Sequence, residues 1–156
     1  MSSKSFGLLV VTFVLSISFP TKAQSVCPRP DKPCGSFKSY ELPFKVSSSP
    51  VARGEDRSAT FYALILKSAK RCAITEEDRL SAQSMFARNK VFVSRFECDS
   101  EDNINYTNLD SSKYSIMAVY AGNTRREATT FVAQLRKTER FPDSYLRRMR
   151  VILVRP

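Results

Sequence analysis

The stretch from Tyr114 to Pro156 constrains the fold most, because its pattern is typical of a strand, a helix and a second strand in succession. Residues 114–120 are apolar and rich in β-branched and aromatic side chains, and Gly122 lies in the break that follows. Residues 124–127, Thr-Arg-Arg-Glu, match a capping box and predict the N-terminus of a helix. The helix then carries one apolar stripe at positions i, i+3, i+4 and i+7: Ala128, Phe131, Val132 and Leu135.

The residues before this stretch repeat the same pattern. Residues 59–66 are apolar on both faces, which is typical of a central strand, and Thr75 begins a second capped helix. Residues 91–96 form the next predicted strand, and residues 145–154 form the last. We therefore predict an α+β domain over residues 58–156 with the ferredoxin-like split βαβ topology (βαββαβ). This topology is a four-stranded antiparallel sheet with two helices on one face and the other face open.

The N-terminal residues 1–23 have the pattern of a secretory signal peptide. Lys4 precedes an apolar run over residues 6–19, and small residues stand before a cleavage site expected after Ala23. The run is short for a membrane span, which disfavours a membrane anchor. We therefore expect a periplasmic or secreted product with no membrane span after cleavage. Residues 24–57 are rich in Pro and Ser and are interpreted as an irregular lead and linker.

The four cysteines of an exported chain favour two disulfides, and four cysteines allow three pairings. In the predicted topology, Cys72 follows the first strand and Cys98 ends the second, which runs parallel to the first. Both cysteines are therefore expected at the same end of the sheet, within reach of each other. We favour a Cys72–Cys98 bridge, with Cys27–Cys34 closing a short local loop. A metal site is disfavoured because the chain has no histidine.

The absence of histidine also excludes the usual general base and the Ser-His and Cys-His nucleophile systems. The sequence contains no glycine-rich phosphate loop, no paired CxxC and no zinc signature. We therefore expect a non-catalytic binding domain that uses no cofactor and no metal. The net charge is +10, and basic residues concentrate in residues 123–156, which indicates a polyanionic partner. A solvated basic face is the alternative.

The last predicted strand carries candidate binding residues. Arg148 and Arg150 alternate with Met149 and Val151, so the arginines lie on the open face if the apolar pair faces the helices. Guanidinium groups suit carboxylates, and tyrosines offer flat surfaces to sugar rings, although these tyrosines have the alternative of packing in the core. The predicted ligand-binding residues on the open face are aromatic or basic: Tyr62, Tyr114, Tyr120, Arg148 and Arg150.

Residues 59–156 resemble the SPOR (sporulation-related repeat) family of bacterial envelope proteins. The resemblance rests on Tyr-Ser-Ile-Met-Ala-Val-Tyr-Ala-Gly at residues 114–122 and on Thr-Arg-Arg-Glu-Ala at residues 124–128. These residues look like the strand, the glycine turn and the helix start of that family. The resemblance implies a domain that binds the glycan strands of peptidoglycan through the open sheet face, in the periplasm and without a cofactor.

Two functional hypotheses follow from these observations. The first is an exported, non-catalytic peptidoglycan-binding domain. The second is a secreted protein-interaction domain, an inhibitor or an envelope accessory factor, which would use the same face to bind a protein partner. A shallow aromatic groove would favour the first hypothesis, and a broad apolar patch would favour the second. We expect no nucleic-acid partner, because the aromatic motif of RNA-recognition domains is absent and the product is exported.

Overall fold

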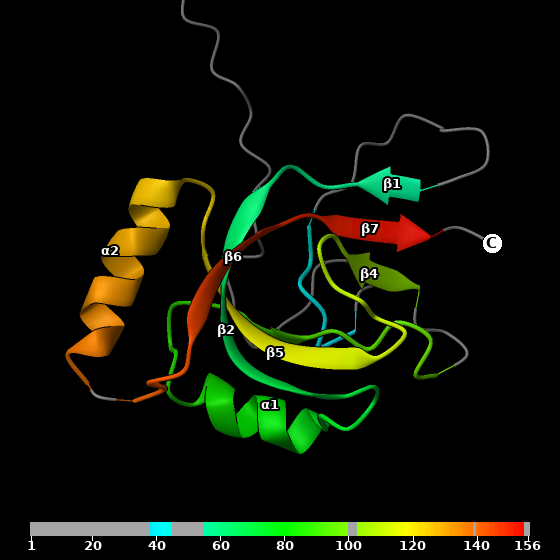
Figure 1. The fold of residues 1–156 in the computed structure, drawn as a ribbon, viewed down its shortest axis with the longest axis horizontal. Helices are drawn as coiled ribbons and strands as arrows, with labels where there is room; N and C mark the ends of the chain where they lie inside the picture. The colour runs from blue at the N-terminus through cyan, green and yellow to red at the C-terminus, as the bar shows by residue number, and fades with distance from the viewer. Residues whose placement is uncertain (1–37, 45–54, 100–102, 139, 155–156) are drawn as a thin grey trace, which may run out of the picture.

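The computed structural model describes residues 38–44, 55–99, 103–138 and 140–154. This part of the chain is an α+β structure with two helices and two antiparallel sheets (Figure 1). The predicted signal peptide and most of the predicted lead lie outside the described residues, so both stay predictions.

The larger sheet contains four strands, each within or overlapping a stretch that the sequence predicts. They lie in the order β3-β5-β2-β6, and every neighbouring pair is antiparallel. The central strand β2 is apolar on both faces because the helices cover one face and a second layer of chain covers the other. The strands of this sheet are β2 (Phe61–Lys70), β3 (Val91–Val93), β5 (Tyr114–Gly122) and β6 (Tyr145–Met149).

Both helices begin where the capping boxes predict: α1 is Glu76–Gln83 and α2 is Arg125–Arg136. In α2, Thr124 Oγ1 accepts a hydrogen bond from the Glu127 backbone N–H at 3.2 Å. The Glu127 carboxylate accepts one from the Thr124 backbone N–H at 3.0 Å. The turn into α2 needs Gly122, whose φ is +132° and where a Cβ would lie 2.6 Å from Glu127 Cβ.

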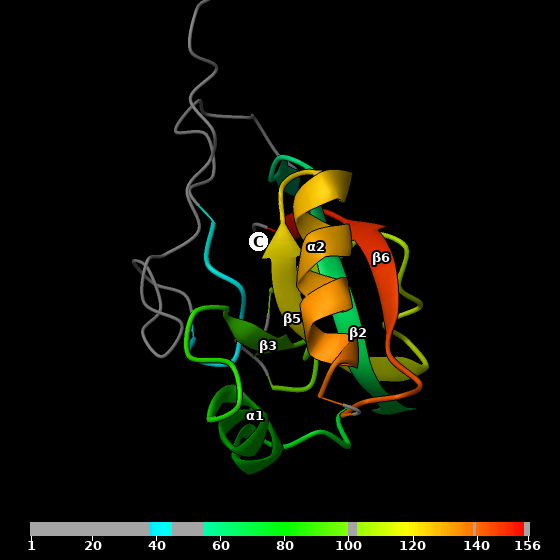
Figure 2. The same cartoon turned by 90° about the vertical axis from the view of Figure 1, so that its left-hand side faces the viewer.

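The two helices cover the same face of the larger sheet. Figure 2 shows α2 lying across β2 and β5, with α1 beside β3. Between the helices and the sheet lies one hydrophobic cluster, in which half-buried Phe131 and Leu135 of α2 pack against buried residues. Those buried residues come from β3, β5, α1 and its flanks: Ile74, Ala82, Phe86, Val91, Val93, Met117 and Val119.

Helix α1 ends earlier than the sequence predicts, at Gln83 instead of residue 88. The reason is the Gln83 side chain, which is almost fully buried. Its Nε2 donates to the carbonyl oxygens of Phe86 and Asn89 at 2.8 and 2.9 Å. Its Oε1 accepts from the backbone N–H of Val91 at 2.9 Å. The amide thus satisfies the backbone of a turn that leads directly into β3.

The smaller sheet contains strands that pair in the order β1-β7-β4. The sequence predicts a single last strand over residues 145–154, but Arg150 interrupts it, and the chain passes from the first sheet into the second. A hydrogen bond fixes the backbone at this interruption: the Arg150 N–H donates to Thr107 Oγ1 at 2.8 Å. The strands of this sheet are β1 (Glu55–Arg57), β4 (Ile104–Tyr106) and β7 (Val151–Val154).

The sheet face opposite the helices is largely covered, which corrects the expectation of an open face. A second hydrophobic cluster fills the space between β2 and the smaller sheet, and Met149 and Val151 point into it instead of towards the helices. Leu42 and Phe44, from the predicted lead, complete this cluster. The hydroxyl of buried Tyr106 accepts a hydrogen bond from the Leu42 backbone N–H at 3.1 Å. The second layer is therefore tied to the first by buried apolar and polar contacts.

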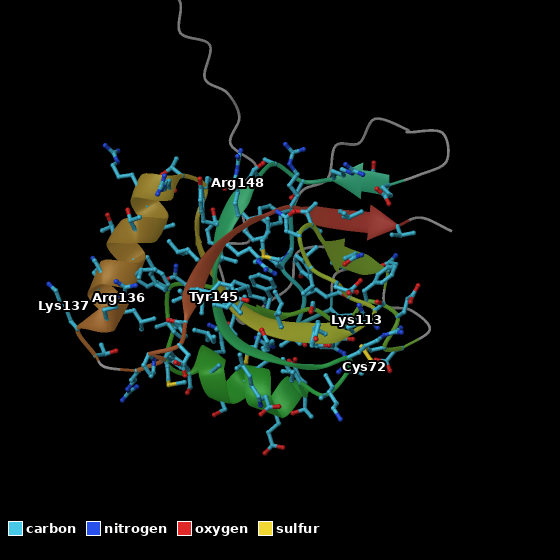
Figure 3. All side chains as sticks on the ribbon, in the orientation of Figure 1. Cys72, Lys113, Arg136, Lys137, Tyr145 and Arg148 are labelled. Atoms are coloured by element: carbon cyan, nitrogen blue, oxygen red, sulfur yellow. A yellow bond between two sulfur atoms is a disulfide. The ribbon has the colours of Figure 1, made fainter. Side chains whose placement is uncertain are left out.

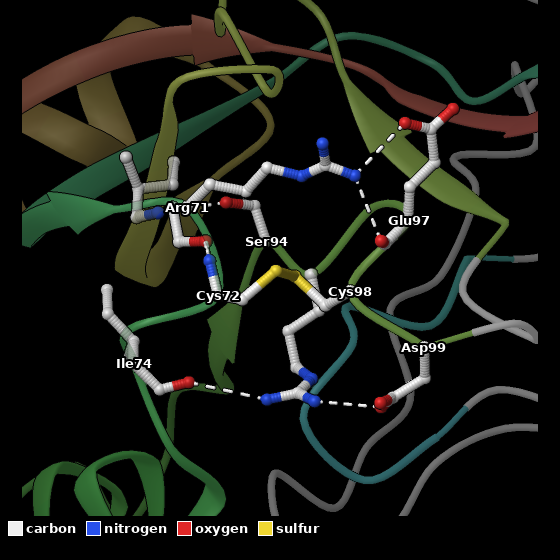
Figure 4. Close-up of a disulfide and its surroundings, with 10 residues drawn as sticks. Arg71, Cys72, Ile74, Ser94, Glu97, Cys98 and Asp99 are labelled. Atoms are coloured by element: carbon white, nitrogen blue, oxygen red, sulfur yellow. Dashed lines mark hydrogen bonds and ion pairs between the residues drawn. A yellow bond between two sulfur atoms is a disulfide. The ribbon is translucent and has the colours of Figure 1, made fainter.

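The Cys72–Cys98 disulfide is present, as predicted, with its Cα atoms 5.5 Å apart (Figure 4). The Cys72 backbone N–H donates to Ser115 Oγ at 2.9 Å. Beside the bridge, one guanidinium nitrogen of Arg71 donates to the carbonyl and carboxylate oxygens of Glu97 at 2.9 and 3.1 Å. The other favoured pair, Cys27–Cys34, lies outside the described residues.

Candidate binding site

A cleft of about 450 Å³ remains on the sheet face opposite the helices, beyond the part that the smaller sheet covers. Its floor comes from the end of β2 and the beginnings of β5 and β6, and its wall is the loop that follows β4. We call it the tyrosine cleft. Its lining residues are Ser68, Asn108, Leu109, Asp110, Tyr114, Ile116, Tyr145 and Arg147.

Two exposed aromatic side chains flank the tyrosine cleft. Tyr114 is 52% exposed and Tyr145 is 45% exposed. In the described part of the chain, the other large apolar side chains with such exposure are Leu80 and Met85, in and after α1. An exposed aromatic ring that keeps its hydroxyl free for hydrogen bonding is the usual surface for an amphipathic ligand such as a sugar.

Polar groups line the wall of the tyrosine cleft and hold it in place. Arg147 is half-buried, donates to the Asn108 carbonyl oxygen at 2.7 Å and lies 5.7 Å from the centre of the Tyr145 ring. Asn108 has φ 62°, a left-handed conformation that asparagine tolerates, and its side chain donates to the Arg148 carbonyl oxygen at 3.1 Å. The loop after β4 therefore both accepts a hydrogen bond from β6 and donates one to it. These bonds fix the wall, so the cleft is preformed.

Asp110 supplies a negative charge at the same wall. Its carboxylate accepts a hydrogen bond from Ser112 Oγ at 2.5 Å and pairs with Lys113 Nζ at 3.2 Å. These contacts, the Ser112 hydrogen bond first, lower the pKa of Asp110 below its ordinary value. The cleft thus offers an ionised carboxylate, a guanidinium group and two phenol hydroxyls for recognition of hydroxyl-rich ligands.

The three tyrosines predicted from the sequence have three different surroundings. Tyr114 lines the tyrosine cleft. Tyr120 is half-buried, its ring lies 5.9 Å from the Phe61 ring and 6.3 Å from the Phe44 ring, and burial raises its pKa to about 12. Tyr62 is half-buried on the face that carries the helices, because its neighbour Phe61 points into the opposite cluster. Of the three, Tyr120 is the tyrosine that packs against the core, which was the alternative to ligand binding.

The two predicted arginines share a second pocket, of about 300 Å³, at the point where β6 passes into β7. We call it the arginine pocket. Because Met149 faces the cluster opposite the helices, its neighbours Arg148 and Arg150 point to the other side, which corrects the predicted orientation. The lining residues are Arg57, Thr60, Thr107, Asn108, Arg148, Met149 and Arg150. The five predicted residues thus do not form one site.

Tyr145, Arg147 and Asp110 of the tyrosine cleft are absent from the residues predicted from the sequence, and only the first two carry a signal in the strand pattern. Tyr145 and Arg147 precede Met149 at spacings of four and two residues, so strand alternation puts all three on one face. In the larger sheet Tyr145 pairs with Ile65, and Arg147 pairs with Ala63. The two-residue alternation of β6 therefore predicts that Tyr145 and Arg147 share a face, but which face that is depends on the face assigned to Met149.

Within residues 38–44, 55–99, 103–138 and 140–154, no group of three or more Asp, Glu, Cys or His side chains is arranged to hold a metal ion. None of the helices in the described part combines the length and the apolar character needed to cross a membrane.

Comparisons with protein-family models, with curated proteins and with solved structures gave no match to this chain.

Proposed function

We propose that this chain is an exported, non-catalytic carbohydrate-binding domain that recognises the glycan strands of peptidoglycan at the tyrosine cleft. The observation that carries the proposal is the pair of exposed rings, Tyr114 and Tyr145, that flank one preformed cleft. The apolar faces of sugar rings stack on such side chains, while hydroxyl groups bond to the phenols and to Asp110. Arg147 provides a fork for a lactyl or peptide carboxylate.

The proposed fold is the ferredoxin-like split βαβ arrangement of a divergent SPOR-like domain. The strand order β3-β5-β2-β6, the antiparallel pairing and the placing of α1 and α2 on one face support this assignment. The smaller sheet is an addition that covers the face through which the resemblance implies binding. The proposed contact with glycan is therefore confined to the uncovered end of that face.

Export to an oxidising compartment is the third part of the proposal. The Cys72–Cys98 disulfide is compatible with an exported protein, because such bonds form and persist outside the cytosol. It supports the signal peptide predicted over residues 1–23.

Co-sedimentation with purified sacculi tests the proposed function. The exported chain is mixed with intact sacculi and with sacculi stripped of stem peptides, at low and high salt. We expect binding to stripped sacculi that survives high salt and that falls about twofold to tenfold in each of Tyr114→Ala and Tyr145→Ala, because each removes a stacking surface worth about 0.5–1.5 kcal/mol. Leu80→Ala is the matched control, because Leu80 is as exposed as Tyr114 but lies on α1.

Three results would count against the proposal. Binding that disappears at high salt for both kinds of sacculi would reflect charge alone, because salt screens exposed charges. Binding that survives in both tyrosine variants would remove the tyrosine cleft from the contact. An absence of binding would favour the second hypothesis, an envelope or secreted protein partner.

A further inference from the structure

The arginine pocket is separate from the tyrosine cleft, although the Asn108 loop borders both. Three chain segments meet in it: the end of β1 and the residues leading into β2, the residues after β4, and the passage from β6 to β7. Each of the first and third segments brings arginine to the pocket, and the second brings hydroxyl and amide groups. In Figure 3, Arg148 of β6 lies well away from Arg136, the last residue of α2.

Hydrogen bonds hold Arg150 in one position. Its backbone N–H donates to Thr107 Oγ1 at 2.8 Å, and its backbone carbonyl oxygen accepts from the Thr107 N–H at 3.0 Å. Its side-chain Nε donates to Thr60 Oγ1 at 3.0 Å. No further bond of the Arg150 guanidinium group occurs within the described residues, so its terminal nitrogens are available to a ligand.

The charge in the pocket is not balanced by the described residues. Arg57 pairs with Glu55 at 2.7 Å. Arg148 forms no ion pair or side-chain hydrogen bond with any described residue, and the pocket lining contains no acidic side chain. Arg148 and Arg150 therefore contribute two positive charges that no partner offsets. Two like charges that line one pocket repel each other, so an anion bound between them would be stabilising.

We propose that the arginine pocket binds a phosphate group. A carboxylate has two oxygens and is satisfied by one guanidinium fork, whereas a phosphate presents three or four acceptor oxygens to forks that arrive from different directions. A phosphate monoester carries a charge of about −1.5 to −2 at neutral pH, which matches the two unbalanced arginines. The Thr60 and Thr107 hydroxyls and the Asn108 amide supply further polar contacts. The pocket volume of about 300 Å³ leaves room for the alcohol that a phosphate ester carries.

Nuclear magnetic resonance titration of the exported chain tests this site, with inorganic phosphate, glycerol phosphate and linear polyphosphate as probes and acetate as the carboxylate comparison. Ionic strength is held constant throughout. We expect saturable shifts of the backbone signals of Thr60, Thr107 and Arg150 with phosphate. Arg148→Gln and Arg150→Gln should each weaken binding by at least about tenfold, which corresponds to the loss of one charge-assisted hydrogen bond. Arg136→Gln makes the same change of charge elsewhere and should leave the affinity unchanged.

The probes distinguish the sources of the phosphate group. Equal affinity for inorganic phosphate and for the longer probes supports a small-anion site, and much tighter binding of polyphosphate supports a site for a phosphate-bearing polymer. Acetate binding as tight as phosphate binding would overturn the phosphate assignment. Linear, unsaturable shifts, or equal weakening in Arg136→Gln, would overturn the site. Binding of phosphate should persist in Tyr114→Ala, so failure of the glycan proposal and failure of this one give different results.

Discussion

Single residues show where sequence reasoning succeeded and where it stopped. Strand alternation puts Tyr114 and Tyr120 on the same face of β5, opposite the helices, because Ile116 and Ala118 between them point into the cluster on that face. Their surroundings differ because Phe44 packs against Tyr120. Phe44 is 76 positions away from Tyr120 in the sequence, and no local pattern predicts that contact. The face could be predicted, but not the exposure.

For the last strand, the face assigned to Met149 determines which side chains are predicted to lie in the binding site. The sequence pattern of alternating Met149 and Val151 does not tell which layer the two side chains join. Because the period of a strand is two residues, the opposite choice moves every side chain of β6 to the other face. For this reason Tyr145 and Arg147 line the tyrosine cleft. Arg148, which the sequence places on the binding face, lines the arginine pocket.

At the residue scale, we predict that Gln83→Ala lowers the free energy of unfolding by about 3 kcal/mol. The substitution leaves the Val91 N–H and the Phe86 carbonyl without their partner, and each buried unsatisfied group costs about 1–3 kcal/mol. Urea denaturation followed by circular dichroism measures the change. Leu80→Ala, on the exposed side of α1, should change stability by less than 1 kcal/mol. A Gln83→Ala effect as small as that of Leu80→Ala would contradict the prediction.

At the scale of the elements, local signals predicted the helix starts better than the strand ends. The capping boxes at Thr75 and Thr124 concern residues three positions apart, so both are visible in the sequence and both are present. The break at Arg150 depends on Thr107, 43 residues earlier, and the end of α1 depends on a buried amide. The Thr107 contact has no signature in a short window of sequence, and the Gln83 contacts are local but depend on the burial of a polar side chain, which the sequence pattern does not indicate.

The α2 capping box also predicts a pH dependence. The Glu127 carboxylate accepts hydrogen bonds from the backbone N–H groups of Thr124 and Asn123 at 3.0 and 2.8 Å, and these bonds lower its pKa below the ordinary value of 4.5. A carboxyl group whose pKa is lower in the folded state stabilises the fold above its unfolded pKa, and this stabilisation is lost as the pH falls through the folded pKa.

We therefore expect the unfolding free energy of the wild type to fall more steeply below pH 4.5 than that of Glu127→Gln. The measurement is urea denaturation at a series of pH values from 7 down to 3, with the difference between the two proteins as the readout. Asp78 and Asp110 also have lowered pKa values and remain in both proteins, so their contributions cancel in the difference. Parallel pH profiles would show that the Glu127 contact contributes nothing to folding.

At the scale of the whole molecule, the two layers set what the surface offers. The α+β class, the Cys72–Cys98 bridge and the four strands of the larger sheet follow from patterns that the sequence carries. The second layer follows only in part: β7 lies within the last predicted strand, whereas β1 and β4 are only three residues long and residues 42–44 belong to a stretch that is read as irregular. Covering most of the sheet face confines its open part to the tyrosine cleft, and the passage of the chain from β6 to β7 forms the separate arginine pocket.

The disulfide gives the last prediction, because it encloses a defined part of the molecule. The Cys72–Cys98 bridge closes a loop with a sequence separation of 26, which contains α1 and β3. Cys72 and Glu97 have φ values of 60° and 57°, left-handed conformations that are unfavourable for residues with a Cβ. The bridge holds this strained geometry and restricts the unfolded chain, which for a loop of this length corresponds to about 3.5 kcal/mol of stability.

We expect the double variant Cys72→Ser/Cys98→Ser to lose about 3.5 kcal/mol of unfolding free energy. Hydrogen exchange should show the largest loss of protection in α1 and β3, because β2, β5 and β6 are held together by their own pairing. Cys72→Ala/Cys98→Ala should reproduce both effects, which separates the loss of the bond from the effect of the serine side chains; reduction of the wild type would also open the predicted Cys27–Cys34 bridge. Unchanged stability, or an equal loss of protection in all strands, would mean that the bridge does not anchor this end of the sheet.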